Sequence, residues 1–221
     1  MVKAVIFDLD GTLLDRDASL REFLKDQYAR IPQLQRIPRS AYMERFIALD
    51  QRGYVWKDEV YRRLIAEFGF DLRWETLLAD YWEGFRHHSR PFPNAGSMLE
   101  ALRARSLSIG LISNGYGEFQ SANFRALGFA DLFDEVIFSE WEGLRKPDAA
   151  IFHRMLDKLD VEPHEAMYVG DHPVSDVAGS RAAGLMGVWK YDQLLEAPDE
   201  HDGVLMDLAD LVGLIDDYLR R

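Results

Sequence analysis

Short apolar runs recur along the chain, each bounded by polar or turn-forming residues. Such runs are typical of strands buried on both faces of a parallel sheet, because helices cover both sides of that sheet. Five runs of this kind predict strands: Val2–Phe7, Leu107–Ile112, Glu135–Phe138, Ala166–Val169 and the shorter Gly187–Trp189.

Between these runs, apolar residues recur at the three-to-four-residue spacing of an amphipathic helix. Strands that alternate with helices predict right-handed crossovers and a doubly wound parallel sheet, so we expect an α/β, Rossmann-like core. The predicted helices of this part are Ser97–Ala104, Glu118–Leu127, Asp148–Leu159, Val174–Ala183 and Leu205–Leu219.

Residues 16–90 have a different pattern, since they contain no strand-like run bounded by turns. The sequence therefore predicts a small all-helical domain over 16–90, inserted after the first strand of a core domain made of 1–15 and 91–221. The helices expected in the insertion are Ala18–Ala29, Arg39–Leu49, Lys57–Phe68 and Trp74–His88.

Composition narrows the class of partner. The 221 residues carry a formal net charge of -12, which disfavours binding to nucleic acid or to an anionic membrane, because both need a basic surface. The chain has no cysteine and no apolar stretch approaching the ~18 residues of a membrane span. We therefore expect a soluble cytoplasmic protein; the sequence carries no signal for an oligomeric state.

Acidic residues directly follow two of the predicted strands. Asp8 and Asp10 come after the first strand, and alternation places both on one side, with Leu9 facing away. Asp171 follows another strand. Ligands of an open α/β sheet bind at the carboxyl ends of its strands, so we expect these carboxylates to meet there. Hard oxygen ligands without cysteine or paired histidine favour Mg²⁺, which also neutralises their mutual repulsion.

This pattern predicts phosphoryl transfer. A carboxylate beside Mg²⁺ can attack phosphorus and form an aspartyl-phosphate, while a second carboxylate protonates the leaving oxygen and then deprotonates the attacking water. Ser113, Asn114 and Gly115, at the end of another strand, offer a hydroxyl, an amide and backbone N–H groups to phosphate oxygens.

Lys146 precedes Pro147 and a predicted helix. Its ammonium can screen Asp8 and hold the transferring phosphoryl group. Taken singly, each of these short motifs is more typical of a turn or a helix start than of a catalytic site. Their occurrence together, each at a strand end and in this order, favours the catalytic interpretation.

The sequence resembles the haloacid-dehalogenase-like superfamily. The resemblance spans the whole chain and is carried by four segments in order: Asp8–Thr12, Ser113–Gly115, Lys146 with Pro147, and Gly170–Asp176.

The resemblance implies a role for each of these residues. Asp8 would be the nucleophile and Asp10 the acid/base. Mg²⁺ would be held by the side chains of Asp8 and Asp171 and by the backbone carbonyl of Asp10. Asp176 would contact the ion through a water molecule or lie just outside its ligands. The expected catalytic residues are Asp8, Asp10 and Lys146, and the expected metal ligands are Asp8, Asp10 and Asp171. The expected substrate-binding residues are Thr12, Ser113, Asn114, Gly115 and Lys146.

The helical insertion resembles the cap of subfamily I, which includes phosphoglycolate phosphatases, nucleotidases and β-phosphoglucomutases. In these relatives the cap closes over the site and selects the substrate. Arg52 and Lys57, on either side of a break that begins at Gly53, are candidate substrate contacts. Asp10 separates the chain from true haloacid dehalogenases, which resemble it in fold but lack an acid there and need no magnesium.

The main hypothesis is a phosphoglycolate-phosphatase-like enzyme that hydrolyses a small phosphorylated metabolite. Phosphoglycolate, a nucleoside monophosphate and a sugar phosphate satisfy the pattern equally. The first alternative is a phosphomutase of the β-phosphoglucomutase type. Further alternatives are a haloacid dehalogenase and a receiver-like phospho-switch, although a switch would need neither a helical cap nor an acid at Asp10.

Overall fold

The computed structural model describes residues 1–219, and the chain divides into two compact units. The larger unit consists of residues 1–15 together with the chain from Pro91 onward. The smaller unit is Arg16–Arg90. Each unit has its own buried apolar residues, for example Ile6 in the larger and Phe46 in the smaller.

Within residues 1–219, the larger unit contains one six-stranded sheet in which all neighbouring strands run parallel, in the order β3-β2-β1-β4-β5-β6. This arrangement confirms the predicted doubly wound α/β fold. The strands are β1 (Ala4–Phe7), β2 (Ser108–Ser113), β3 (Glu135–Phe138), β4 (Ala166–Gly170), β5 (Met186–Lys190) and β6 (Gly203–Leu205).

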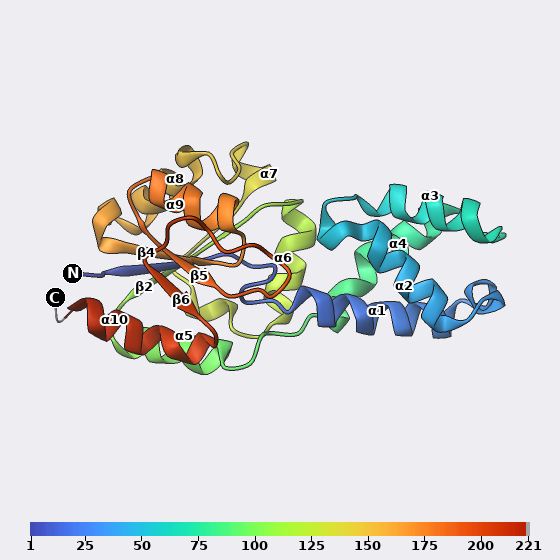
Figure 1. Cartoon of the computed structure of the whole chain (residues 1–221), viewed down its shortest axis with the longest axis horizontal. Helices are drawn as coiled ribbons and strands as arrows, with labels where there is room; N and C mark the ends of the chain where they lie inside the picture. The colour runs from blue at the N-terminus through green and yellow to red at the C-terminus, as the bar shows by residue number, and fades with distance from the viewer. Residues whose placement is uncertain (220–221) are drawn as a thin grey trace. The chain divides into compact units, whose positions relative to one another are not determined.

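Helices cover both faces of this sheet, which explains why its central strands are apolar throughout. Helices α5 and α10 lie on one face, and α8 and α9 lie on the other (Figure 1). On the second face, Ile6 and Tyr168 of the sheet pack with Phe152 of α8 in one buried cluster. The helices of this unit are α5 (Ala95–Ala104), α6 (Gly117–Ala126), α7 (Ser139–Glu142), α8 (Ala149–Leu159), α9 (Gly179–Ala182) and α10 (Leu211–Leu219).

Two predicted helices are wrong at their starts. Helix α10 begins at Leu211 rather than at Leu205, because Leu205 pairs with Lys190 as the last residue of β6. The segment expected as a helix from Val174 begins instead as a wide π-helical turn over Pro173–Ala178 and becomes α-helical only in α9.

The chain order places a topological switch point at the centre of the sheet. Strand β1 lies between β2 and β4, so that Ile6 faces Gly110 on one side and Tyr168 on the other. After β1 the chain adds β2 and β3 on one side and then crosses to add β4, β5 and β6 on the other. Strand order reverses between β1 and β4, and open α/β sheets bind ligands beyond the carboxyl ends of strands at such a reversal.

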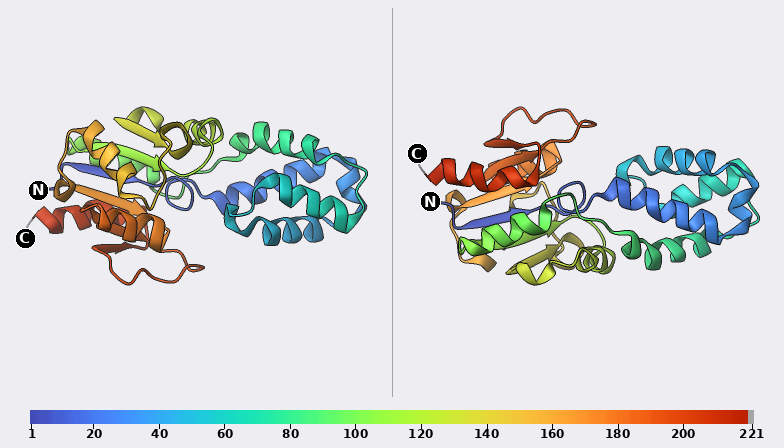
Figure 2. Two further views of the ribbon diagram at one scale, coloured as in Figure 1. Left: turned by 90° about the horizontal axis from the view of Figure 1, so that it is seen from above. Right: turned by 90° about the horizontal axis from the view of Figure 1, so that it is seen from below.

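The smaller unit is entirely helical, with its helices packed side by side (Figure 2). The α-helix that begins at Trp74 ends at Gly84 rather than at His88, and a short 3-10 turn follows over Phe85–His88. The helices are α1 (Arg16–Arg30), α2 (Arg39–Asp50), α3 (Lys57–Phe68) and α4 (Trp74–Gly84).

A buried glutamine joins the helices of this unit. The side-chain oxygen of Gln27, in α1, accepts hydrogen bonds from the hydroxyls of Tyr42 (2.6 Å) and Tyr61 (3.0 Å), and its nitrogen donates to Asp80 (2.9 Å). Gln27 is fully buried, as are both tyrosines. A buried polar group is stabilising only when its hydrogen bonds are satisfied, so these four residues depend on one another.

We expect Gln27→Leu to lower the free energy of unfolding by roughly 2–4 kcal/mol, because it leaves two buried hydroxyls without their acceptor. Urea denaturation measures this loss. Adding Tyr42→Phe and Tyr61→Phe to the variant should recover part of the stability, since both partners are then apolar. The control Gln193→Leu changes an exposed loop glutamine and should shift stability by less than about 0.5 kcal/mol. Equal losses in the Gln27 and Gln193 variants would contradict this role.

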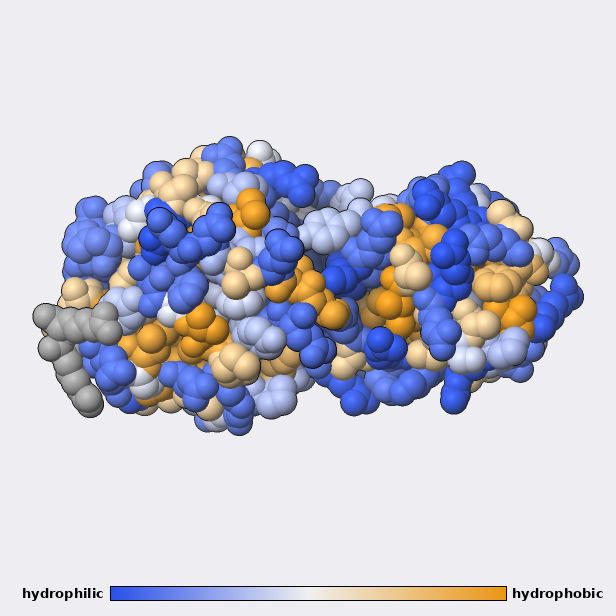
Figure 3. Space-filling view, in the orientation of Figure 1, coloured by the Kyte–Doolittle hydropathy of each residue, from blue (hydrophilic) through white to orange (hydrophobic). Residues whose placement is uncertain are grey.

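The face drawn in Figure 3 is mostly hydrophilic, with scattered apolar areas over both units. Among residues 1–219, no helix is both long enough and apolar enough to cross a lipid bilayer.

Candidate active site

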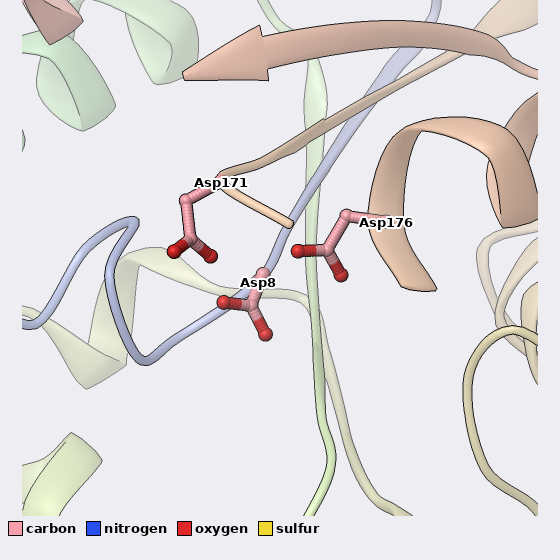
Figure 4. A group of neighbouring side chains, drawn as sticks. All are labelled: Asp8, Asp171 and Asp176. Carbon is pink, nitrogen blue, oxygen red and sulfur yellow. The ribbon is translucent and has the colours of Figure 1, made fainter. Parts of the chain in front are cut away.

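Three buried carboxylates meet at the carboxyl ends of β1 and β4 (Figure 4). Asp8 follows β1, Asp171 follows β4, and Asp176 comes from the π-helical turn after β4. One oxygen of each carboxylate lies within 4.8 Å of the others. The backbone N–H of Asp8 donates to the carbonyl of Val169 (2.9 Å), so strand pairing itself brings the first two acids together.

Lys146 supplies the cation of this cluster. Its Nζ donates to Asp8 (2.5 Å), to Asp176 (2.7 Å) and to the hydroxyl of Tyr168 (2.8 Å). The lysine is 3% exposed, so these bonds replace its contacts with water. A buried ammonium is tolerated only when paired and hydrogen-bonded in this way.

Burial raises the pKa of the Asp8 carboxyl to about 7; Lys146 opposes this rise and Asp176 adds to it. Burial alone would lower the pKa of Lys146, but Asp176 and Asp8 raise it well above its ordinary value. With Asp8, Asp171 and Asp176 ionised, one ammonium faces three carboxylates, an excess of two negative charges. A divalent cation would balance that excess, and the oxygen-only donor set suits a hard ion.

Two glycines make the close approach of these acids feasible. Gly11 has a φ of +85°, and a Cβ atom there would overlap the carboxylate of Asp171. Gly170 ends β4, and a Cβ atom there would overlap the side chain of Asp176. Any larger residue at either position would push an acid out of the cluster.

A model of the haloacid dehalogenase-like hydrolase family matches residues 5–189, most of the chain. This chain belongs to the haloacid dehalogenase-like hydrolases. The predicted family is thereby confirmed, and all four segments that carried the resemblance lie within the matched residues.

Relatives of this hydrolase include phosphatases. It is 29% identical to the glyceraldehyde 3-phosphate phosphatase of Pyrococcus furiosus, over 97% of this chain and 93% of that protein. It is 32% identical to the phosphoglycolate phosphatase of Rhodospirillum rubrum, over 84% of this chain and 78% of that one. Both relatives belong to the predicted enzyme class, hydrolases of phosphoric monoesters.

Solved structures of two kinds resemble the hydrolase. A phosphatase of the same family from Thermococcus onnurineus superposes with a TM-score of 0.69 at 28% identity, covering 97% of this chain and 98% of that one. A 2-haloacid dehalogenase from Pseudomonas syringae superposes with a TM-score of 0.68, also at 28% identity, covering 99% and 100%. The fold is thus shared by both chemistries, and the residues of the site must separate them.

His172 shapes the turn that carries Asp176 in this hydrolase. Its Nδ1 accepts hydrogen bonds from the backbone N–H groups of Val174 (3.1 Å) and Ser175 (3.0 Å). Its own backbone N–H donates to Asp176 (3.0 Å). Because Lys146 binds the other oxygen of Asp176, both oxygens of that carboxylate have protein partners. Asp176 is therefore better placed to support the cluster than to ligate an ion directly.

The expected phosphate-binding residues make hydrogen bonds with neighbouring groups of the protein. The amide of Asn114 makes two hydrogen bonds of 3.0 Å with the backbone of Lys146, which fixes that lysine in place. The backbone N–H of Gly115 donates to the Ser139 hydroxyl (3.0 Å). Thr12 is fully buried, and its hydroxyl donates to Asp8 (3.4 Å). These contacts give Asn114 and Thr12 supporting positions.

Three residues of the site have no counterpart in the sequence motifs. The hydroxyl of Tyr168 binds Lys146, and burial raises the pKa of that phenol well above its ordinary value, so it stays neutral. The indole N–H of Trp189, in β5, donates to the backbone carbonyl of Asp171 (2.7 Å). Gln120, in α6, donates to Asp10. These residues are recognised in the structure by their buried polar contacts, but no local sequence pattern predicts their role.

The candidate contacts in the helical unit have different surroundings. Lys57 is 1% exposed and forms an ion pair with Asp50, and its ammonium lies 5.4 Å from the centre of the Tyr81 ring. The side chain of Lys57 is thus part of the interior of that unit. Arg52 has a left-handed backbone with a φ of +57°, between Gln51 and Gly53, which also have positive φ values.

Proposed function

We propose that this hydrolase is a magnesium-dependent phosphatase that hydrolyses a small phosphomonoester through an aspartyl-phosphate on Asp8. The observation that carries this proposal is the buried Asp8 carboxylate, held by Lys146 beside Asp171 and Asp176. The names of the relatives point to two- and three-carbon phosphate esters as the first substrates to test. None of the relatives described above is a phosphomutase.

In the first step, an oxygen of Asp8 attacks phosphorus as the bond to the leaving oxygen breaks, and Asp10 gives its proton to that oxygen. Lys146 stays bonded to Asp8 and balances charge on the transferring group. In the second step, Asp10 takes a proton from water as the water oxygen attacks phosphorus. The bond between phosphorus and Asp8 breaks, which returns the free carboxylate and releases inorganic phosphate.

The charge excess of the cluster fits a divalent ion. Asp8 and Asp171 would hold Mg²⁺ with their side chains and Asp10 with its backbone carbonyl, and the bound ion would neutralise the phosphoryl oxygens. Lys146 alone leaves two negative charges uncompensated, which would repel an anionic substrate from the nucleophile.

The proposed activity is tested with a panel of phosphometabolites that includes phosphoglycolate and glyceraldehyde 3-phosphate, with and without Mg²⁺. Release of inorganic phosphate that depends on Mg²⁺ is expected from the wild-type protein. Conversion of one sugar phosphate into another without phosphate release would indicate a mutase instead. Halide release from a 2-haloacid without added metal would indicate a dehalogenase.

Metal binding has its own expected result. Saturating Mg²⁺ should raise the melting temperature of the chelator-treated protein by roughly 5–10 °C, because it binds the native state only. Asp171→Asn should abolish this rise by removing a ligand, whereas the exposed loop variant Asp199→Asn should retain it. Differential scanning calorimetry measures both. An equal Mg²⁺ response in the Asp171 and Asp199 variants would place the ion elsewhere.

A further inference from the structure

The carboxylate of Asp10 is held by a residue outside the sequence motifs. Gln120 donates from its side-chain nitrogen to the Oδ2 atom of Asp10 at 2.5 Å. Gln120 is 4% exposed and lies on the first turns of α6, 110 residues away in the sequence. Within residues 1–219, this is the one side-chain hydrogen bond to Asp10 that the structure describes.

The same amide nitrogen also reaches the loop after β2. It lies 3.0 Å from the hydroxyl of Ser113 and 3.2 Å from the backbone carbonyl of Asn114. One buried amide thus joins the loop that carries Asp10 to the end of β2, which carries the expected phosphate-binding hydroxyl. A hydrogen bond to an ionised acceptor is stronger and more directional than a neutral one.

The backbone makes room for this glutamine. Gly115 has a φ of +140°, and a Cβ atom there would lie 3.1 Å from the Cγ atom of Gln120. A side chain at Gly115 would therefore press on Gln120 and, through it, on Asp10. Burying a long polar side chain costs conformational freedom and hydration, so its precise hydrogen bonds must offset that cost.

We propose that Gln120 is a positioning residue. Its amide holds the Asp10 carboxyl in place for proton transfer and fixes its position relative to the Ser113 hydroxyl. This role rests on the proposed phosphatase function. Proton delivery is needed most when the leaving group is a poor one, such as the alkoxide of an alkyl phosphate. It is needed least for p-nitrophenolate, which leaves without protonation. A misplaced Asp10 should therefore harm the two substrate types unequally.

The test compares phosphoglycolate with p-nitrophenyl phosphate in Gln120→Leu and Gln120→Glu. The value of kcat/KM covers the steps only as far as the phosphorylated enzyme. For phosphoglycolate it should fall by about 10- to 100-fold, and for p-nitrophenyl phosphate by less than about threefold. Water activation also needs Asp10, so the variants should release one equivalent of p-nitrophenol in a burst before slow turnover. Gln120→Glu keeps the side-chain volume but loses the donor, and it should behave like the leucine variant.

Asn123→Leu is the matched control, because Asn123 lies on the same helix, is 1% exposed and has no hydrogen-bond partner within residues 1–219. It should leave the ratio of the two kcat/KM values unchanged. Melting curves establish that each variant folds. If a Gln120 variant does not fold, Gln120→Asn replaces it, because this change withdraws the amide by one methylene group. Equal losses of kcat/KM for both substrates in the Gln120 variants, or no loss for either, would overturn the role proposed for Gln120 but not the proposed phosphatase function. No turnover of either substrate by the wild-type protein would overturn the proposed function with it.

Discussion

Asp8→Asn is expected to lower the rate of phosphate release by about four orders of magnitude or more, because an amide cannot attack phosphorus as a carboxylate does. Inorganic phosphate release under saturating substrate and Mg²⁺ measures the loss. Mass spectrometry of acid-quenched wild-type protein should detect one phosphoryl group on the peptide that contains Asp8, and none in the variant. Asp199→Asn, in an exposed loop, should keep full activity. Turnover in Asp8→Asn comparable to wild type would refute the assignment of the nucleophile.

The same substitution should stabilise the metal-free protein. Folding raises the pKa of Asp8 from 3.8 to about 7, so the native state binds more protons than the unfolded chain between these values. Stability contributed at this position therefore falls as pH rises from about 4 to 7. Asp8→Asn buries no charge at this position. Above pH 7 its free energy of unfolding should therefore exceed that of the wild-type protein by about 1–3 kcal/mol. Urea denaturation of the wild-type and variant proteins, with chelator present, measures their free energies of unfolding at pH 5 and at pH 8.

Lys146→Met should also abolish activity, but with the opposite effect on stability. It removes a cation that bonds to both Asp8 and Asp176 and leaves those buried carboxylates without their positively charged partner. Breaking a buried ion pair from one side costs about 3–5 kcal/mol. The loss should be larger at pH 8 than at pH 5, because Asp8, whose pKa burial raises to about 7, is protonated at the lower pH and then buries no charge.

Two further variants separate this effect from a general loss of lysine. Lys158→Met removes a partly exposed lysine of α8 whose contact with Glu135 spans 3.4 Å, and it should change stability by less than about 1 kcal/mol. Combining Lys146→Met with Asp8→Asn should recover part of the lost stability, since one of the unpaired charges is then gone. A metal-free Lys146→Met protein as stable as wild type at pH 8 would show that the cluster does not need its cation.

The sheet was predictable from sequence where a strand is buried on both faces. Strands β1 and β4 lie in nearly continuous apolar runs, and the sequence locates their ends to within two residues. Strand β6 was missed because it has three residues, begins with Gly203 and pairs on one side only, with β5. The predicted start of α10 is too early for the same reason, because the apolar Leu205 fits the helical pattern but belongs to β6.

The site was predictable only as far as its residues follow strand ends. Asp8 and Asp171 could be placed together because parallel strands end at one edge of the sheet. The partners of Asp10 could not be placed in this way, because the Gln120 contact depends on how the first turns of α6 pack. The paired hydrogen bonds between Asn114 and the Lys146 backbone were likewise unforeseen, since a side-chain amide suits a phosphate oxygen and a peptide equally well.

The central position of β1 has a consequence for the order in which the protein is made. Residues 4–7 are synthesised before their sheet partners, which begin only at residues 108 and 166. The helices of residues 16–90 make their contacts within their own unit and can assemble in the meantime. Until those partners are made, the apolar β1 segment has no sheet neighbour, and the charges of Lys3 and Asp8 on either side of it disfavour its pairing with other chains.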